Sequence, residues 1–365
     1  MGKIYTALGL MSGTSLDGID ASIISSDGDK NVEILDNEFV SYPYKFREKL
    51  TKYIKKISSK EDITKSFSEY KDIEKELTKL HFQISSKIIQ NKNYEIDIVG
   101  FHGHTIIHRP KLKYSIQMGD PNLLSNLLKL KVVFNFRNHD LDNGGDGAPL
   151  APIYHMAISE KISTTSPLLF LNIGGISNFT YFFNGELEAK DIGPGNVLID
   201  DFLKKTKNIN FDKEGEIASI GNPDMNLIKQ FIEHEIYNSN EKHSYDRSEF
   251  DFNFVKGLQF EDAVSTLTYF TATIISNYIN SNYSDKINVI LCGGGRKNKT
   301  LIKYIKELTN KKINNIDEYN LNGDFIESQA FAYLAIRSTL KKNISYPKTT
   351  KVSKPISGGE TFENF

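Results

Sequence analysis

The sequence contains almost no cysteine, the residue that stabilises many secreted proteins. Its 365 residues include a single cysteine, Cys292. One thiol cannot form an intramolecular disulfide, and it cannot build a cysteine-based metal cluster. We therefore expect a reducing, cytoplasmic location and a fold stabilised by its hydrophobic core, which a chain of this length can bury.

Long hydrophobic runs are also missing. No stretch reaches the roughly 18 to 20 apolar residues that a membrane-spanning helix needs. The N-terminal sequence, MGKIYTALGLMSGTSLDGID, has a short apolar run followed by polar, glycine-rich residues, and it lacks the apolar core and cleavage pattern of a signal peptide. These features argue against a membrane protein and against secretion.

The chain has no large excess of charge of either sign. Its 45 basic and 46 acidic residues leave a formal charge of −1. No net field draws such a protein toward nucleic acid or a membrane surface. We therefore expect neither among its partners.

The first third of the chain has the pattern of a strand meander followed by helix. Apolar runs at residues 4–10, 19–25 and 32–40 are separated by Gly, Asp and Ser clusters and predict three antiparallel strands. Apolar residues at helical spacing predict one long helix within residues 44–91. Further buried strands are predicted near residues 96–101 and 132–136.

The second half repeats this order of elements. Runs at 168–173, 177–183 and 187–192 predict another meander, in which an Asn-Gly pair is a strong hairpin signal. Helices follow, then a strand at 288–291 and a last helix at 326–340. Two such halves predict an internal duplication of structure around a shared cleft, although no sequence repeat is visible.

The length, at roughly 150 residues per domain, also predicts about two domains. We place the first domain at residues 1–138 plus 326–365, and the second, which carries much of the nucleotide site, at 139–325. The tail after Tyr346 has no hydrophobic period, and its Lys, Thr, Ser, Pro and Gly residues predict a surface loop.

Glycine-rich turns follow three of the predicted strands. Gly9, Gly13 and Gly18 lie in GLMSGTSLDGID, and further turns occur at 171–178 in LNIGGISN and at 291–298 in LCGGGRKN. Glycines let backbone amides approach an anion, and hydroxyls complete a phosphate cradle. One such loop is equally well an ordinary hairpin, but three at strand ends indicate a nucleotide site. None matches the GxxxxGK[ST] or GxGxxG fingerprint.

Several motifs together resemble one enzyme family, the anhydro-N-acetylmuramic acid kinases. In chain order they are GLMSGTSLDGID, GFHGHTIIHRP, SIQMGDPNLL, NGGDGAPLAP, LNIGGISN, DIGPGN, LCGGGRKN and ESQAFAYLA, and they extend from Gly9 to about Arg337. The resemblance implies an α/β fold with two RNase H-like (actin-like ATPase) domains, each a mixed sheet plus helices, around a central cleft.

The resemblance also implies an activity. Members of this family use ATP and Mg²⁺ to open 1,6-anhydro-N-acetylmuramic acid with water and to phosphorylate O6, which gives N-acetylmuramic acid 6-phosphate during peptidoglycan recycling. A homodimer is compatible with this family. The alternatives are a kinase of another hexose or amino sugar, and an actin- or Hsp70-like ATPase that acts on no sugar.

The resemblance places the catalytic base at Asp191, the first residue of DIGPGN. Water must lose a proton to attack C1 of the sugar, and a carboxylate can accept that proton. An ordinary helix N-cap is the alternative role for Asp191. Asp17, Asp20 and Asp191 are candidate Mg²⁺ ligands, and the sequence does not distinguish among them.

The three glycine turns are the predicted ATP site. The residues that the resemblance implies are Ser12, Gly13, Thr14, Ser15, Asp17 and Gly18 in the first loop, Gly174, Gly175 and Ser177 in the second, and Gly293, Gly294 and Gly295 in the third. The first two loops are expected at the phosphates and the third beneath the nucleoside.

The predicted sugar contacts are His102, Gln117, Asp120, Asn122, Arg137 and Glu327. Arg137 is able to pair the substrate carboxylate with a bidentate fork, and a structural salt bridge is the alternative. Glu327 is equally an acid favoured at a helix start. The chain departs from the family pattern at His104, Asn135, Asp146 and Asp246.

Overall fold

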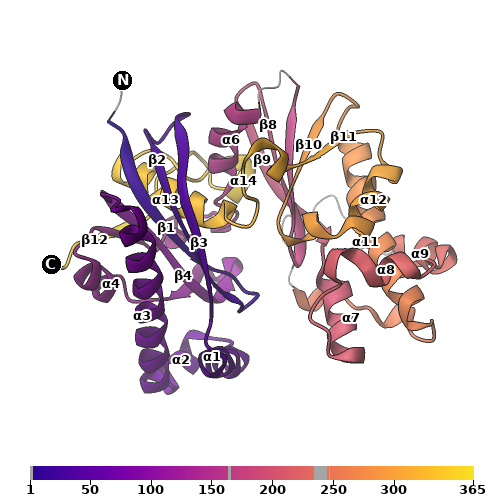
Figure 1. Ribbon diagram of the computed structural model, residues 1–365, viewed down its shortest axis with the longest axis horizontal. Coiled ribbons are helices and arrows are strands. Elements are labelled where there is room, and N and C mark those ends of the chain that lie inside the picture. The colour runs from indigo at the N-terminus through magenta and orange to yellow at the C-terminus, as the bar shows by residue number, and fades with distance from the viewer. Residues whose placement is uncertain (1–2, 163–165, 234–244, 246) are drawn as a thin grey trace. The chain divides into compact units, whose positions relative to one another are not determined.

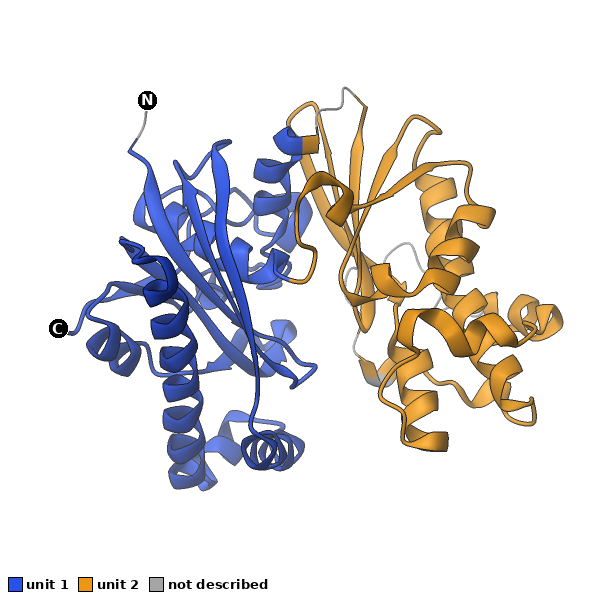
Figure 2. Ribbon diagram, viewed as in Figure 1, with its two compact units in different colours: residues 1–161, 325–365 blue, residues 162–324 orange. Residues whose placement is uncertain are grey.

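The computed structural model describes residues 3–162, 166–233, 245 and 247–365, which form two compact units (Figures 1 and 2). Unit 1 comprises Met1–Lys161 and Phe325–Phe365, and unit 2 comprises Ile162–Asp324. Each unit has a hydrophobic core of its own. The chain therefore passes from one unit to the other twice.

Unit 1 is built on a mixed sheet in the order β12-β6-β4-β1-β2-β3, with β5 paired to β4. Its strands are β1 (Tyr5–Ser12), β2 (Gly18–Ser26), β3 (Val32–Ser41), β4 (Ile98–Arg109), β5 (Tyr114–Met118), β6 (Val132–Phe134) and β12 (Glu360–Phe362). Strands β1 to β3 are antiparallel, whereas β4 runs parallel to β1 and β6. The register places Gly9 opposite Gly100 and Ser12 opposite His104.

Helices cover the sheet of unit 1. They are α1 (Tyr44–Lys56), α2 (Lys60–Lys65), α3 (Phe67–Lys92), α4 (Pro121–Leu128), α5 (Asn138–Asp142), α6 (Pro152–Ser159), α13 (Ile326–Thr339) and α14 (Pro347–Thr350). Helix α13 contacts the strands directly, because two glycines remove the side chains that would separate them. A Cβ atom on Gly9 would lie 1.9 Å from the carbonyl oxygen of Ser328, and one on Gly100 would lie 2.1 Å from that of Phe331.

Unit 2 repeats the same architecture with a sheet in the order β11-β10-β7-β8-β9. Its strands are β7 (Leu168–Ile173), β8 (Ile176–Phe183), β9 (Glu186–Pro194), β10 (Asn288–Cys292) and β11 (Lys312–Asn315). Its helices are α7 (Val197–Lys207), α8 (Glu216–Ile220), α9 (Met225–Ile232), α11 (Phe260–Asn282) and α12 (Lys299–Leu308). None of the described helices of either unit is long and apolar enough to cross a bilayer.

The two sheets share one topology. In each, three consecutive antiparallel strands adjoin two parallel strands at the side of the first strand. This order confirms the predicted α/β fold class of two RNase H-like (actin-like ATPase) domains. The cleft between the domains stays a prediction.

Two local predictions were wrong. Residues 44–91 form three helices rather than one, because Ser59 begins α2 with a capping box in which its side chain and that of Asp62 each accept the other's backbone N–H. The tail after Tyr346 contains helix α14, and its strand β12 pairs antiparallel with β6.

The boundary after unit 1 lies at residues 161 and 162, whereas the sequence suggested 138 and 139. Helix α6 accounts for the difference, because its Tyr154 contacts α13. The Tyr154 hydroxyl donates to Oε1 of Gln329 at 2.8 Å, and its ring centroid lies 5.6 Å from that of Tyr333.

Candidate active site

Asp191 has the environment of a proton acceptor. It lies on β9 opposite Asn178 and is half-buried. Its Oδ2 accepts the backbone N–H of Tyr245 at 3.0 Å, and its other oxygen receives no hydrogen bond from the described residues. Burial raises the pKa of Asp191 to about 6, an effect that the Tyr245 hydrogen bond opposes. A carboxylate with this pKa is largely ionised at pH 7 and is still basic enough to take a proton.

The alternative role of Asp191 as a helix cap is not observed. The residue at the N-cap of α7 is Asn196, five positions further along the chain, and no side chain caps this helix. The cap explanation therefore does not account for the aspartate in DIGPGN.

The β7–β8 turn lies against the start of α7. Gly195 and Val197 donate their N–H groups to the Gly175 carbonyl oxygen at 2.9 and 3.1 Å, and Asn196 donates to that of Gly174 at 2.8 Å. A Cβ atom on Gly175 would meet nothing within 4 Å. Packing within the protein therefore does not require this glycine, whereas the close approach of an anion would.

Ser177 and the third glycine turn are shaped by packing. Ser177 is fully buried, and its hydroxyl donates to the Pro194 carbonyl oxygen at 3.3 Å. A Cβ atom on Gly293 would lie 2.3 Å from Oδ1 of Asn172, and one on Gly295 would lie 2.3 Å from the Ile173 side chain. Of the three glycines, only Gly294 faces open space.

Arg296 holds this third turn in place. It is buried, and its guanidinium pairs with Asp317 at 3.0 Å and with Asp324 at 2.8 Å. Its Nη1 also donates to the Gly293 carbonyl oxygen at 3.1 Å. Sequence reasoning missed this residue, although an arginine directly after three glycines at the end of a buried strand was a usable signal.

In unit 1 the loop between β1 and β2 is held at both ends by Tyr42. The buried Tyr42 hydroxyl hydrogen bonds to Oγ of Ser12, which also contacts Nδ1 of His104 at 2.9 Å. The backbone N–H of Tyr42 donates to the Asp17 carbonyl oxygen at 2.9 Å. Sequence reasoning missed Tyr42, because nothing local links it to this loop.

The other predicted residues of the loop have different surroundings. Thr14 and Ser15 are exposed, and Oγ of Ser15 donates to Oδ1 of Asp17 at 2.6 Å. A Cβ atom on Gly13 would meet nothing closer than 3.5 Å. On Gly18 it would lie 2.2 Å from the Val40 carbonyl oxygen, so packing on β3 explains this glycine.

The candidate metal ligands belong to both units. Asp17 is exposed and Asp20 half-buried in unit 1, and Asp191 belongs to unit 2. Among the described residues, no three His, Cys, Asp or Glu side chains are grouped closely enough to hold a metal ion. Mg²⁺ usually takes one or two carboxylates and completes its shell with water and phosphate oxygens. The exposed carboxylate of Asp17 in a phosphate-type loop therefore fits such a site.

Arg137 is a charged group without a carboxylate partner among the described residues. Its Nε and Nη2 donate to Nε2 of His102 at 3.1 and 2.9 Å, and its Nη1 donates to the Gly147 carbonyl oxygen at 2.9 Å. Burial lowers the pKa of Arg137 to about 10, and attraction by Glu327 and Asp140 opposes this effect. Within the described part of the chain, no carboxylate forms an ion pair with Arg137, so the salt-bridge alternative is not observed.

His102 positions this arginine. Its Nδ1 donates to the Gly103 carbonyl oxygen at 2.9 Å, so both ring nitrogens already have partners. Burial, and then the charge of Arg137, hold the pKa of His102 well below its ordinary value. Glu327 lies in the first turn of α13, and its side chain is exposed. Desolvation of its carboxyl group by the surrounding protein raises the pKa of Glu327, and the positive charge of Arg137 opposes this effect.

Comparison with known proteins decides the family. Residues 5–364 match the family described as anhydro-N-acetylmuramic acid kinase. The chain belongs to this family. A relative from Pelagibacter ubique with that name is 46% identical over 375 residues, which span 100% of both chains. Relatives of the same name from Zymomonas mobilis and Brucella canis are 38% and 34% identical and align over 97% and 98% of this chain and 98% and 99% of their own.

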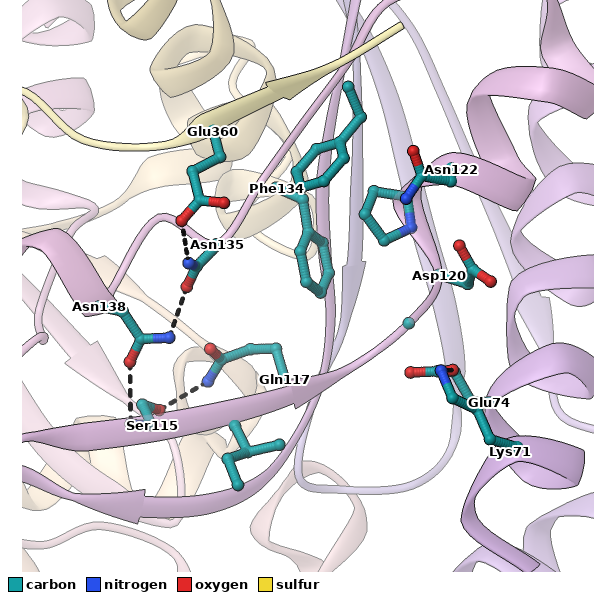
Figure 3. A pocket seen from close by; sticks show the side chains of 14 residues that line it. Lys71, Glu74, Ser115, Gln117, Asp120, Asn122, Phe134, Asn135, Asn138 and Glu360 are labelled. Atoms are coloured by element: carbon teal, nitrogen blue, oxygen red, sulfur yellow. Dashed lines mark hydrogen bonds and ion pairs between the residues drawn. The ribbon is translucent and has the colours of Figure 1, made fainter. Parts of the chain in front are cut away.

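For a member of this family, the predicted sugar contacts fall into two groups. Gln117, Asp120 and Asn122 line a cavity of unit 1 whose lining does not include His102, Arg137 or Glu327 (Figure 3). Asp120 is also the N-cap of α4, where its Oδ1 accepts the Leu123 N–H at 2.9 Å.

The departures from the family pattern have structural roles of their own. His104 supports Ser12, and Asp146 pairs with Lys351 at 2.8 Å, which ties its loop to the C-terminal segment. Asn135 adopts a left-handed backbone with φ of 55° and hydrogen bonds to Glu360. Asp246 lies outside the described residues.

Proposed function

We propose that this protein is a cytoplasmic, ATP-dependent kinase that opens 1,6-anhydro-N-acetylmuramic acid with water and phosphorylates O6, giving N-acetylmuramic acid 6-phosphate in cell-wall recycling. The observation that carries this proposal is Asp191, a half-buried carboxylate with a raised pKa and one oxygen that receives no hydrogen bond from the described residues. Full-length membership of the family supports it. A homodimer stays a prediction.

Asp191 is the base of the proposed reaction. The carboxylate oxygen that Tyr245 does not contact takes a proton from water while the water oxygen forms a bond to C1 of the sugar. The C1–O6 bond breaks as this bond forms, and O6 then attacks the γ-phosphorus of ATP while the bond to the leaving ADP oxygen breaks. The geometry supports this role because Tyr245 holds one carboxylate oxygen and so orients the other.

The glycine turns are the proposed phosphate contacts. Gly13, Thr14 and Ser15 in unit 1, and Gly174 and Gly175 in unit 2, have open surroundings in which backbone N–H groups can meet an anion. Gly294 is the corresponding candidate for the nucleoside. Mg²⁺, when bound, neutralises phosphate charge, and we propose Asp17, Asp20 and Asp191 as its candidate ligands.

Arg137 is the proposed partner of the sugar's carboxylate. A guanidinium has five N–H donors, and the contacts to His102 and Gly147 leave donors on Nη1 and Nη2 for a bidentate pair. Desolvation makes this half-buried charge favour an anionic partner. Glu327 is the proposed hydrogen-bond acceptor for a sugar hydroxyl, and contacts from Gln117, Asp120 and Asn122 remain predictions.

The reaction is tested in ¹⁸O-labelled water. Hydrolytic opening must place one solvent oxygen on the C1 hydroxyl of the phosphorylated product, which mass spectrometry detects. Unlabelled N-acetylmuramic acid 6-phosphate incubated for the same time corrects for exchange at C1. A product without label would indicate an ordinary sugar kinase, and ADP release that is independent of any sugar would indicate an ATPase.

A further inference from the structure

Unit 1 contains a cavity of about 470 Å³ whose lining includes the predicted sugar contacts Gln117, Asp120 and Asn122. Its lining includes none of Asp191, Arg137 and Glu327, to which the proposed reaction assigns roles. Residues of α3, β5, α4 and β12 and the segment around β6 line it (Figure 3). Its volume falls within the range of roughly 300 to 1,000 Å³ that is typical of small-molecule sites.

One wall of the cavity is a continuous chain of hydrogen bonds, which Figure 3 shows. The Asn135 amide donates to Oε1 of Glu360, and the Asn138 amide donates to Oδ1 of Asn135 at 2.6 Å. Oδ1 of Asn138 accepts the Ser115 N–H at 3.1 Å, and Oγ of Ser115 accepts from the Gln117 amide at 2.7 Å. This chain fixes which atom each amide presents to the cavity.

The chain leaves one acceptor without a donor. Gln117 is 8% exposed, and its Nε2 donates to both Thr105 at 3.0 Å and Ser115 at 2.7 Å. No donor in the described ranges hydrogen bonds to its Oε1. This oxygen is not among the fully buried atoms of the described residues, and Gln117 lines the cavity, so a ligand hydroxyl in the cavity can donate to it.

The charge of the lining excludes anions. Glu74, Asp120 and Glu360 contribute three carboxylates, whereas the one cationic side chain of the lining, Lys71, already pairs with Glu74 at 2.6 Å. The lining therefore repels ligands that carry a phosphate or carboxylate group, and the acidic sugar of the proposed reaction is one of them. This repulsion argues against Gln117, Asp120 and Asn122 as contacts of that sugar. Phe134 lies in the same lining with Phe362, and rings of this kind provide apolar surface for the C–H groups of a sugar ring.

We propose that this cavity is an accessory binding site for a neutral, hydroxyl-rich ring, such as a monosaccharide without a carboxylate or phosphate group. The oxygen acceptors of the lining match the hydroxyl groups of such a ring, and the two phenyl rings match its C–H groups. The net negative charge of the lining favours a ring that carries no anionic group. Binding there is separate from turnover, so the proposed function can fail without affecting this one.

The test measures binding of N-acetylglucosamine to the full-length protein without ATP, by calorimetry or saturation-transfer NMR. We expect saturable binding that Phe362→Ala weakens at least fivefold, since it removes one ring. Asn135→Asp should weaken binding by a similar factor, because it breaks the hydrogen-bond chain and adds a carboxylate facing Glu360. Inorganic phosphate should not compete.

Matched controls are Phe365→Ala and Asn364→Asp, two exposed residues outside the cavity lining that should leave binding unchanged. Thermal melts check that each variant is folded. Absence of saturable binding, or unchanged binding in both cavity variants, would overturn the proposal. A second result would also overturn the proposal: N-acetylglucosamine competes with the anhydro sugar in the kinase reaction, and Phe362→Ala raises KM for the anhydro sugar. The cavity would then belong to the acceptor site of the kinase.

Discussion

At the scale of single residues, Asp191 is the most exacting test of the proposed reaction. Asp191→Asn keeps the shape of the side chain and can still accept the Tyr245 N–H, so we expect a folded protein that binds both substrates. The amide cannot take a proton from water, so turnover should fall by orders of magnitude. Single-turnover assays and calorimetry measure the two properties. Asp72→Asn, at an exposed position of α3, is the control, and near-normal turnover of Asp191→Asn would remove the residue from this role.

The pKa of Asp191 also predicts an effect on stability. Because the folded pKa of about 6 lies above the ordinary 3.8, the folded state binds this proton more tightly than the unfolded state. The contribution of Asp191 to the free energy of unfolding therefore falls as pH rises from about 4 to about 6 and stays low above that range. Asp191→Asn should be more stable than the natural protein at pH 7, by up to about 3 kcal/mol. Urea melts should show this gain shrinking toward pH 4, and an equal or lower stability at pH 7 would contradict the assignment.

Tyr42→Phe tests whether the loop between β1 and β2 must be held rigidly. The variant keeps the buried ring and the backbone contact to Asp17 but loses the hydroxyl that contacts Ser12. We expect a loss of about 1 kcal/mol in the free energy of unfolding and a several-fold higher KM for ATP with little change in KM for the sugar. Tyr44→Phe, at a position that is 79% exposed, is the control. An unchanged KM for ATP would show that the hydrogen bond between Tyr42 and Ser12 does not affect ATP binding.

Most of the site residues that the sequence predicts lie in motifs, whereas Tyr42, which it missed, does not. Asp191 was predicted because it begins the string DIGPGN, and Arg137 was predicted because a guanidinium can pair the substrate carboxylate. Tyr42 is separated from Ser12 by 30 positions and meets it only after β3 has formed and turned back. The sequence also could not show that Gln117 lines the cavity of unit 1 and that Arg137 does not, because this depends on how the unit folds.

At the scale of elements, a glycine packed against another element and a glycine in open surroundings predict different effects of alanine on stability. Gly9→Ala would place a methyl group 1.9 Å from the Ser328 carbonyl oxygen and push α13, which carries Glu327, away from β1. We expect a loss of about 3 kcal/mol in the free energy of unfolding. Gly175→Ala meets nothing within 4 Å, so its stability should change by about 0.5 kcal/mol or less.

Gly175→Ala, which should leave stability nearly unchanged, is expected to weaken ATP binding. If phosphate approaches the β7–β8 turn, Gly175→Ala should raise KM for ATP about tenfold, although the protein remains as stable as before. Denaturant melts and initial rates on both variants measure these properties. A Gly175→Ala variant with unchanged KM for ATP would argue against this turn as a phosphate contact.

The regular elements of the fold could be predicted because their signals are local. Alternating apolar runs and glycine turns marked β1 to β3 and β7 to β9, and the same signals gave the duplication. The helix breaks were missed because the apolar residues on either side of the polar stretch 58–62 were assigned to one helix, whereas Ser59 in that stretch begins α2 with a capping box. Strand β12 was missed because it is three residues long and forms only by pairing with β6.

At the scale of the whole molecule, the two units share one sheet topology but differ in the side chains near their glycine-rich turns. The loop after β1 and the turn after β7 occupy corresponding positions in the two sheets, and both are rich in glycine. Unit 2 adds the carboxylate of Asp191, whose pKa is raised, near its turn. Unit 1 adds Glu327, whose pKa is also raised, and the guanidinium of Arg137, which has no carboxylate partner among the described residues. The duplication therefore explains the scaffold, and the differences between the units explain the proposed division of roles.

The near-zero net charge predicts how the enzyme responds to salt. A protein with a formal charge of −1 has little long-range field to steer anionic substrates, so screening should remove little of the association rate. The contact proposed for Arg137 is local and partly shielded from solvent, and salt screens such pairs weakly. We expect kcat/KM for the anhydro sugar to change less than about threefold between about 50 and 300 mM KCl. Arg137→Ala should raise KM for this sugar at every salt concentration, which separates the local contact from steering. A tenfold fall in kcat/KM of the natural protein over that range would show that a concentrated patch of charge, rather than the half-buried guanidinium of Arg137, attracts the substrate.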